Sequence, residues 1–578
     1  MVVIGPGIVG MPMAALLARA RIREGRADPA SVVVLQRASS TSGWKVDAIN
    51  GGRSPIGGVE PELDGIVADA VGAGLLSATS DAATVRDADV ILVCVQTDKK
   101  GLVPDYGPLF EALTHVAEQL RDRPAGNIPL IIFESTLAPS SMTTVVREHF
   151  AHYGLAEGRD ILLGNSPNRV MPGRLVERVQ SSDKIVAGLH PTTPQLIRRL
   201  YTRIVSRGTL YPANSMTAEV VKTLENAYRD VRIAYAAEVV RECDTRGVDF
   251  FALRDQVNAQ IAQTDGASAD PTAVPSGGLL VPTVGVGGHC LPKDGILLWW
   301  RGIEHGEDQS RSLILAARDV NDASPAETIR LTERTTGSIA GWRVALLGTA
   351  YRFNSEDTRN SPTLVLARLL LDRGCSVRLH DPYVRPDDQY LRKFGFTSQF
   401  TRDLGAAVAD AELLVMCTAH HDYVAARASI LEAAPRAAAL VDACNLYRRS
   451  DFQGERVQYT GIGRGRAAPS ATDVASVVEG FRAVERGVAN EVQAVTKFLN
   501  RHYARDEFNR VQFDEVQRLA HTCVTGCAIV DAGSVGPLAN GIGARSSLAR
   551  RAAGLDGLAT EVSRGASHRP AEAAEERP

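Results

Sequence analysis

The sequence contains short apolar runs without polar interruption, separated by stretches with helical periodicity. Such runs lie at residues 2–4, 32–35, 90–95 and 130–133, each bounded by turn-forming residues. A strand with one solvated face alternates apolar and polar residues, whereas a strand buried on both faces of a parallel sheet is apolar throughout. Because helical stretches alternate with these runs, the sequence predicts a doubly wound βαβ sheet.

A second set of runs has the same character further along the chain. Between the two sets, residues 217–247 are free of Pro and reach their first Gly only at Gly247, with apolar residues recurring at three and four; this predicts an amphipathic helix of about 30 residues. The fold class is therefore α/β, with two Rossmann-like domains joined by a long central helix and a helical, partly disordered C-terminal tail. The second set predicts strands at 344–348, 377–381, 413–417 and 439–442 and a helix at 362–373.

A chain of 578 residues needs several hydrophobic cores. We predict a Rossmann domain at 1–200, a central helical domain with a cysteine loop at 201–335, a second Rossmann-like domain at 336–466 and a tail at 467–578. Within the tail, 473–503 is predicted to form one or two amphipathic helices. The last 40 or so residues are rich in Ala, Gly, Arg and Ser and are predicted to be disordered.

Composition excludes several classes of function. The net charge of -3 gives no basis for a nucleic-acid partner. No apolar run approaches the ~20 residues that cross a bilayer, so no membrane partner is expected. The eight cysteines contain no C-x-x-C pair, which argues against a metal site and against a secreted disulfide framework. Reduced thiols of this kind favour a cytoplasmic location.

A glycine-rich loop follows the first predicted strand. Gly5, Gly7 and Gly10, with Ile8 and Val9 between the last two, form G-x-G-x-x-G between a strand and a helix. The first glycine permits the tight turn, the second lets backbone approach a pyrophosphate, and the third lets the helix pack on the strand. The helix N-terminus then faces the phosphate charge. The loop predicts a dinucleotide site; a glycine turn without a ligand is the alternative.

The end of the second strand departs from the usual pattern of this site. NAD enzymes normally carry an acid there that hydrogen-bonds the adenosine ribose. Here the place holds Gln36, followed by Arg37. Gln36 can bond a ribose hydroxyl but does not repel a 2'-phosphate, and Arg37 either binds such a phosphate or points idly into solvent. NAD is expected, with NADP possible.

A cysteine lies in a glycine-rich bend at 285–294, with the sequence Gly-Val-Gly-Gly-His-Cys-Leu-Pro-Lys-Asp. Glycines there let a substrate approach the sulfur of Cys290, and Asp294 can orient a water or take a proton. A buried, inert cysteine is the alternative. Lys222 and Asn226 lie four apart and share one face of the central helix, where they can hold an oxyanion. A solvated charged stripe is the alternative for that face.

Several ordered motifs resemble the family of UDP-glucose, UDP-N-acetylhexosamine and GDP-mannose dehydrogenases. Besides the glycine loop and the cysteine bend, they are Glu-Ser-Thr-Leu-Ala-Pro at 134–139, Leu-Glu-Asn-Ala-Tyr-Arg-Asp-Val at 224–231 and Asp-Thr-Arg-Asn-Ser-Pro at 357–362. The similarity runs from Val2 to about Arg466. It implies NAD-dependent, four-electron oxidation of the carbon-six alcohol of a nucleotide sugar to the uronic acid. The acid would serve cell-surface polysaccharide synthesis.

The resemblance also implies roles for particular residues. Cys290 matches the family's nucleophile, which passes through a thiohemiacetal and a thioester; Lys222 and Asn226 match the groups that stabilise the oxyanion, and Asp294 the partner of the water. Thr136 matches a threonine beside that water and, with Thr97, belongs to the expected cofactor site. The substrate-binding residues implied are Asn168, Arg169, Lys222, Asn226, Gly287, Tyr351, Arg352 and Arg359.

Two features leave the function open. Asn168 stands in Ser-Pro-Asn-Arg, where the family usually has a glutamate; an amide cannot act as a base, so we expect Asn168 to bind rather than catalyse. A two-electron alcohol or hydroxy-acid dehydrogenase would share the fold without needing Cys290, and a catalytically weak nucleotide-sugar sensor is a further alternative. The motifs favour a UDP-N-acetylhexosamine over UDP-glucose as the substrate. We also expect a homodimer through the central helix.

Overall fold

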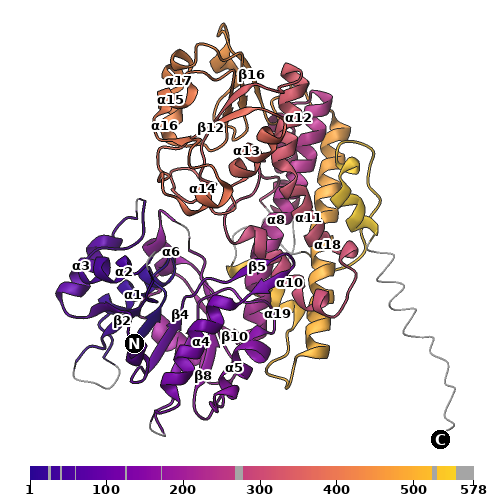
Figure 1. Ribbon diagram of the computed structural model, residues 1–578. Helices are drawn as coiled ribbons and strands as arrows, with labels where there is room; N and C mark the ends of the chain where they lie inside the picture. Colours follow the sequence, from indigo (N-terminus) through magenta and orange to yellow (C-terminus); the bar gives the residue numbers. More distant parts are fainter. Residues whose placement is uncertain are drawn as a thin grey trace, which may run out of the picture.

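Figure 1 shows the computed structural model as two lobes braced along one side by long helices. The N-terminal lobe lies below the C-terminal lobe, and helices α8 and α18 run past both. The structure describes residues 1–23, 28–39, 42–58, 60–123, 126–170, 172–266, 277–523, 527, 530 and 532–554.

The N-terminal lobe is built on an eight-stranded sheet with the strand order β10-β9-β8-β7-β4-β1-β2-β3. All neighbours pair in parallel except β8 and β9. The predicted apolar runs form its central strands, because both faces of the sheet are covered by helices and the runs are buried. The strands are β1 (Val2–Ile4), β2 (Val32–Leu35), β3 (Leu76–Thr79), β4 (Val90–Val93), β7 (Leu130–Phe133), β8 (Leu162–Asn165), β9 (Lys184–Gly188) and β10 (Leu210–Asn214).

The remaining elements of this lobe connect those strands. A short antiparallel hairpin, β5 (Asp98–Lys100) with β6 (Val103–Asp105), follows β4. The helices are α1 (Gly10–Arg19), α2 (Trp44–Asn50), α3 (Leu63–Gly72), α4 (Gly107–Leu120), α5 (Arg147–His152), α6 (Leu175–Ser181) and α7 (Thr193–Tyr201), with single turns at Ala82–Val85 and Met142–Val146.

The C-terminal lobe has a six-stranded parallel sheet with the order β13-β12-β11-β14-β15-β16. Its strands are β11 (Arg343–Leu347), β12 (Ser376–His380), β13 (Phe400–Thr401), β14 (Leu413–Met416), β15 (Ala439–Asp442) and β16 (Gln458–Gly461). Its helices are α13 (Pro362–Asp372), α14 (Gln389–Phe394), α15 (Leu404–Val408), α16 (His421–Ala425) and α17 (Arg427–Ala433), with one turn at Arg449–Phe452. The prediction of two Rossmann-like sheets is confirmed.

The long central helix is α8 (Ser215–Arg246). The side chain of Asn214 caps its first turn by accepting from Thr217 N, and Gly247 ends it with a φ of 70°. The predicted length is confirmed, but the amphipathic face is not: most of α8 is buried, because other helices pack around it. Those helices include α9 (Phe250–Gly266), α10 (Leu291–Glu304), α11 (Leu313–Asp322) and α12 (Ser324–Thr336), with a turn at Gln309–Arg311.

The C-terminal segment packs against this bundle. It begins with one continuous helix, α18 (Ala471–His502), followed by α19 (Phe513–Cys523), a turn at Gly543–Arg545 and a helical stretch at 547–554. The prediction of disorder over the last 40 or so residues is wrong for 539–554, where Leu548, Ala549 and Ala552 are fully buried. Their small apolar side chains fit against α8 and α18, which the composition alone does not reveal. Residues 555–578 lie outside the described part of the chain.

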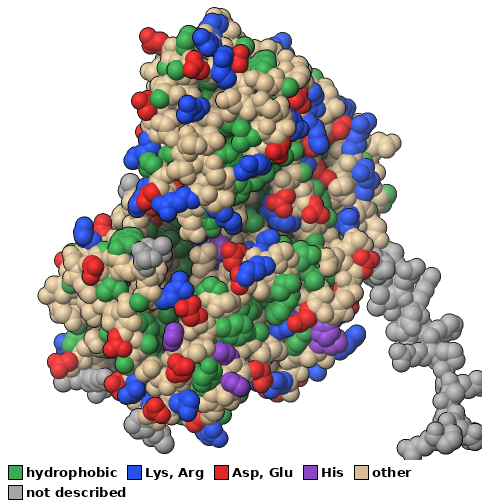
Figure 2. Space-filling model, viewed as in Figure 1, with side chains coloured by type: hydrophobic (Ala, Val, Ile, Leu, Met, Phe, Trp, Pro, Cys, Tyr) green, Lys and Arg blue, Asp and Glu red, His purple; other side chains and the backbone are tan. Residues whose placement is uncertain are grey.

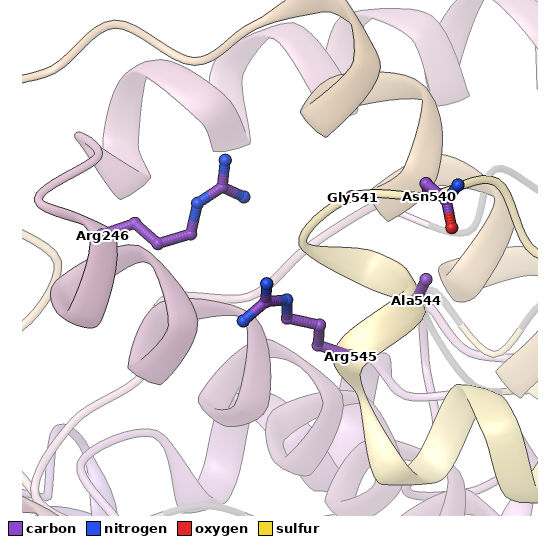
Figure 3. A pocket seen from close by; sticks show the side chains of 5 residues that line it. All are labelled: Arg246, Asn540, Gly541, Ala544 and Arg545. Carbon is purple, nitrogen blue, oxygen red and sulfur yellow. The ribbon is translucent and has the colours of Figure 1, made fainter.

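A pocket of about 460 Å³ opens where the C-terminal segment meets the end of α8 (Figure 3). It is lined by Arg246, Asn540, Gly541, Ala544 and Arg545, and both guanidinium groups point into it (Figure 3). Both arginines are already paired with carboxylates, so the pocket is held together by ion pairs of the chain itself. Within the described residues, no helix is long and apolar enough to cross a membrane.

Candidate active site

The glycine loop lies at the carboxyl end of β1, between β2 and β4. Gly5 has a φ of 91°, and a Cβ on Gly10 would lie 2.1 Å from the carbonyl oxygen of Gly5. No atom would lie within 4 Å of a Cβ on Gly7. The loop is therefore closed by Gly5 and Gly10 and open at Gly7, which is the space a pyrophosphate needs beside the N-terminus of α1. These residues fit a dinucleotide.

Gln36 and Arg37, which follow β2, both have side-chain partners. The Gln36 amide donates to the carbonyl of Arg37 at 3.0 Å and to Ser42 Oγ at 3.1 Å. Arg37 Nη1 lies 2.8 Å from Glu111 Oε2 on α4. This ion pair leaves 63% of the Arg37 side chain exposed, and the two alternatives that the sequence left open, phosphate binding and an idle side chain, both stay predictions.

Thr97 and Thr136, from the loops after β4 and β7, meet beside the glycine loop. The Thr97 hydroxyl donates to the carbonyl of Thr136 at 2.7 Å. His289 reaches this pair from the cysteine loop, with Nε2 2.5 Å from the Thr97 carbonyl and Nδ1 3.3 Å from Gln96 Nε2. Burial and the nearby Lys293 lower the pKa of His289, so the ring is neutral and donates through Nε2. The cysteine loop is thereby attached to the N-terminal lobe.

The cysteine loop is also attached to the C-terminal lobe. The amide N–H of Gly288 donates to the Arg359 carbonyl at 2.8 Å, and the Asn360 side chain donates to the Gly288 carbonyl at 2.9 Å. A Cβ on Gly287 would lie 2.4 Å from the Cβ of Tyr351, so only glycine fits there. These bonds attach the loop to the C-terminal lobe and the histidine attaches it to the N-terminal lobe, so Cys290 lies on a loop that joins the two lobes. Figure 2 shows the surface hollowed between the lobes.

Cys290 is exposed and immediately precedes α10. Burial of the thiol's surroundings and the charge of Asp294 raise the pKa of Cys290 above its ordinary value, while Lys222, Lys293 and Arg359 oppose this shift. Three cations and one carboxylate thus act on the sulfur. The residue is exposed as a whole while its sulfur is largely withdrawn from solvent, and this exposure argues against an inert core cysteine, the alternative in the sequence.

Lys222 and Asn226 are the polar residues of α8 that face the cysteine. Asn226 Nδ2 donates to Asp294 Oδ2 at 2.5 Å, and Lys293 Nζ lies 2.8 Å from Asp294 Oδ1. Lys222 is 6% exposed and Asn226 9% exposed, so the alternative of a solvated stripe is wrong. Asp294 is fully buried, and its carboxylate bonds to both Asn226 and Lys293.

Glu225, on the same helix, links Lys222 to Arg169. Arg169 Nε donates to Glu225 Oε2 at 2.7 Å, and Lys222 Nζ lies 3.6 Å from that oxygen. Burial alone would raise the pKa of Glu225, but Arg169 and Lys222 hold it below its ordinary range. The sequence analysis did not single out Glu225. Its position three residues after Lys222 was the available signal, since such residues adjoin on a helix.

Asn168 is bonded to the buried carboxylate of Glu134, the first residue of the motif at 134–139, for which the sequence predicted no separate role. Its amide donates to Glu134, which also accepts from Tyr201 and from Lys184, whose Nζ is 2.7 Å away. Burial raises the pKa of Glu134, an effect that the Lys184 ammonium opposes. Because Asn168 Nδ2 donates to Glu134, the orientation of the Asn168 amide is set by this buried carboxylate.

The C-terminal lobe contributes Tyr351, Arg352 and Arg359. Arg359 forms a two-pronged ion pair with Asp357, with Nε 2.9 Å from Oδ1 and Nη2 2.5 Å from Oδ2. Burial and the charge of Asp357 raise the pKa of Tyr351 to about 12, so its hydroxyl remains a donor. The Arg352 guanidinium lies 5.4 Å from the centre of the exposed Phe353 ring. Of these groups, Tyr351 lies against Gly287 and Gly288 of the cysteine loop.

The two sheets and the cysteine between them define a class: dehydrogenases with a dinucleotide lobe and a second, nucleotide-binding lobe. Three family models of the UDP-glucose/GDP-mannose dehydrogenase family match the chain. They are the NAD binding domain at 1–205, the central domain at 216–323 and the UDP binding domain at 345–449. The chain belongs to this family and is an NAD-dependent nucleotide-sugar dehydrogenase.

Individual relatives agree with the family. The UDP-N-acetyl-D-mannosamine dehydrogenase of Pyrococcus horikoshii is 30% identical over 467 residues, which cover 80% of this chain and 99% of the relative. The crystal structure of NDP-N-acetyl-D-galactosaminuronic acid dehydrogenase from Methanosarcina mazei Go1 superposes with a TM-score of 0.65 at 30% identity. That alignment covers 80% of this chain and 95% of the other. NAD as cofactor and a UDP-sugar as bound substrate, both expected from the sequence, are confirmed.

Proposed function

We propose that this enzyme oxidises the carbon-six alcohol of a UDP-N-acetylhexosamine to the carboxylate in two NAD-dependent steps on one site. The observation that carries the proposal is the exposed Cys290, held between the lobes with Lys222, Asn226 and Asp294 around it. A two-electron dehydrogenase has no use for this arrangement. The choice of sugar follows the relatives that are named for N-acetylated sugars.

The steps balance on the groups present. The alcohol loses a hydride and a proton and becomes an aldehyde. The Cys290 thiolate adds to the carbonyl carbon, and Lys222 and Asn226 hold the resulting oxyanion of the thiohemiacetal. Loss of a second hydride gives a thioester, and water displaces the thiolate to release the acid. NAD bound at the glycine loop would supply the hydride acceptor for each oxidation.

The remaining site residues receive roles in binding and hydrolysis. Asp294 takes the proton of the hydrolytic water, with Thr136 beside that water and Asn168 as an oriented polar group. The NAD site consists of Gly5, Gly7, Ile8, Val9, Gly10, Gln36, Thr97 and Thr136. The sugar nucleotide is held by Arg169, Gly287, Tyr351, Arg352 and Arg359.

Three broader expectations stay predictions. They are the division into domains at 1–200, 201–335, 336–466 and 467–578, a cytoplasmic location, and a product used for cell-surface polysaccharide. The homodimer through the central helix also stays a prediction.

The test is the ratio of reduced cofactor to oxidised sugar. We expect two NADH for each uronic acid, and no free aldehyde, from a panel of UDP- and GDP-sugars. In Cys290→Ser the rate of uronic acid formation should fall below about a tenth of the parental rate, since loss of the covalent route raises the activation barrier by more than about 1.4 kcal/mol. NAD binding, measured by calorimetry, should be unchanged. One NADH per sugar, with aldehyde released, contradicts the proposal.

A further inference from the structure

Most basic side chains around Cys290 are paired with a carboxylate. The pairs are Lys293 with Asp294, Arg359 with Asp357, and both Arg169 and Lys222 with Glu225. Two further cations differ from these. Within the described part of the chain, neither Arg229 nor Arg352 has a carboxylate within ion-pair distance. Their positive charges are therefore left for a ligand.

Arg229 lies on the face of α8 that carries Lys222 and Asn226. It follows Lys222 by seven residues and Asn226 by three, and side chains at such spacings adjoin along a helix. Its side chain is exposed. Because α8 runs from the N-terminal lobe to the C-terminal lobe (Figure 1), Arg229 is displaced from Asn226 toward the C-terminal lobe. The displacement is about 4.5 Å, at 1.5 Å per residue.

The charges of Arg229 and Arg352 act on each other, although the two residues lie on different elements. Arg352 follows β11 in the C-terminal lobe. Burial lowers the pKa of Arg229, the charges of Arg232 and Arg352 lower it further, and Glu225 opposes this shift. Glu225 is already bonded to Arg169. An anion between the two unpaired guanidinium groups would relieve their repulsion.

The anion whose charge and place fit these two groups is a nucleoside diphosphate. The UDP binding domain of the family covers 345–449 and so includes Arg352. Each phosphate of a diphosphate carries one negative charge, and a guanidinium group can bind two phosphate oxygens at once. When carbon six of the sugar reaches Cys290, the diphosphate lies beyond the hexose ring. Arg229 is displaced from Asn226 by about that length and toward the nucleotide-binding lobe.

We propose that Arg229 and Arg352 clamp the diphosphate of the nucleotide sugar between the central helix and the C-terminal lobe. The proposal rests on the proposed function for the identity of the substrate. Arg352 was already expected to bind the nucleotide, whereas Arg229 receives its role here: it binds the phosphate next to the sugar. The spacing of Arg229 from Lys222 along α8 then sets how far the reacting carbon lies from the diphosphate.

Calorimetric titration with UDP, UMP and uridine tests the clamp without turnover. Arg229→Gln keeps a polar side chain but removes the charge, and it should weaken UDP binding by about tenfold or more, which is about 1.4 kcal/mol. The loss should be smaller for UMP and absent for uridine, because only UDP carries the phosphate next to the sugar. NAD binding should be unchanged. An unchanged affinity for UDP, or an equal loss for UDP and uridine, overturns the proposal.

Two further variants separate the position of the charge from its presence. Arg246→Gln is the matched control, since it removes an exposed arginine from the far end of the same helix, and it should bind UDP as the parent does. An equal loss in Arg246→Gln would make the effect one of net charge and overturn the clamp. Arg229→Lys keeps the charge without the fork of donors, so its affinity for UDP should lie between those of the parent and Arg229→Gln.

The parent enzyme supplies a test that does not depend on the folding of a variant. UDP, but not uridine, should slow the modification of Arg229 by phenylglyoxal, measured by peptide mass spectrometry. Modification at the same rate with and without UDP overturns the proposal.

Steady-state kinetics separate binding from chemistry. Because the clamp holds a part of the substrate that does not react, Arg229→Gln should raise KM for the UDP-sugar and leave kcat within about twofold of the parent. A fall in kcat at unchanged KM would place Arg229 beside the reacting carbon and overturn the clamp. One NADH per sugar would contradict the proposed function instead, since the UDP titrations decide the clamp independently of turnover.

Discussion

At the scale of single residues, one helix carries polar side chains with unrelated tasks. Lys222 and Asn226 of α8 face Cys290 and Asp294, whereas Glu219 accepts from the Ser140 and Met142 amides outside the site. Their spacing along the helix is compatible with a single polar row. The partners of each side chain, which depend on the neighbouring lobes, separate the pair proposed to be catalytic from Glu219, which bonds to backbone amides.

The first residue-scale prediction concerns the ionisation of Cys290. Its pKa is raised by burial and by Asp294, so the thiolate, which is the reactive form, should appear only above the pH at which an ordinary thiol ionises. Alkylation of the Cys290 peptide by iodoacetamide, followed by mass spectrometry against pH, measures this directly. Asp294→Asn should move the midpoint to lower pH because it removes the repelling charge. A midpoint that moves up in the variant would contradict this electrostatic description.

The second concerns cofactor choice. Arg37 is paired with Glu111, so the Glu111 carboxylate competes with a 2'-phosphate for the guanidinium. Glu111→Ala should release Arg37 and raise kcat/KM with NADP relative to NAD by up to about fivefold, since exposed ion pairs contribute roughly 0–1 kcal/mol. The double variant Glu111→Ala with Arg37→Ala is the control and should return the ratio to that of the parent. A ratio unchanged in Glu111→Ala would place the adenosine ribose away from Arg37.

At the scale of elements, the strand–loop–helix unit at the chain start combines packing and binding in three glycines. Gly10 is required by contact between α1 and the loop, since a Cβ would overlap the Gly5 carbonyl and meet Cys94. A Cβ on Gly7, in contrast, would have no neighbouring atom within 4 Å. The same motif thus contains one glycine needed for the fold and another needed for the ligand.

This difference predicts opposite outcomes for two alanine substitutions. Gly10→Ala should destabilise the lobe by about 1–3 kcal/mol, as overpacking does, and lower its Tm. Gly7→Ala should keep the parental Tm and weaken NAD binding, because the methyl group enters the space for the pyrophosphate. Differential scanning calorimetry and NAD titration distinguish the two effects. Parental NAD affinity in Gly7→Ala would show that the cofactor does not approach this loop.

At the scale of the whole molecule, several carboxyl groups are buried at contacts between distant parts of the chain. Burial raises the pKa of Glu219 to about 8 and the pKa values of Asp244 and Glu491 to about 7. Each of these lies at a junction: Glu219 joins α8 to the N-terminal lobe, Asp244 accepts from the Gly463 amide, and Glu491 joins α18 to α11. The stability of all three contacts therefore depends on the protonation of their carboxyl groups.

The prediction is that stability falls as pH rises. Between about pH 4.5 and 7 these groups hold protons in the folded chain but not in the unfolded chain, so folding takes up protons and the free energy of unfolding decreases with pH. The Tm should be lower at pH 8 than at pH 6. Glu219→Gln, which keeps an acceptor oxygen but cannot ionise, should flatten this slope. A Tm that increases from pH 6 to 8 would contradict the raised pKa values.

Several strands, the glycine loop and the central helix are predictable from the sequence alone. Apolar runs and glycine positions predict both sheets, the dinucleotide loop and the length of α8, because these depend on residues close together in the chain. The motifs around Cys290, Lys222 and Asp294 identify the family and indicate the reactive groups that we propose.

The burial, the ion pairs and the packing of these strands and helices follow from contacts between distant elements, which the sequence does not show. The burial of α8, the Glu111 partner of Arg37 and the support of Lys222 by Glu225 and Arg169 come from elements distant in sequence. The docking of residues 467–554 on α8 is of the same kind: small residues of low-complexity composition pack where shape is complementary. Composition records which residues are present, whereas burial and pairing depend on what faces them, and that is fixed only when the whole chain has packed.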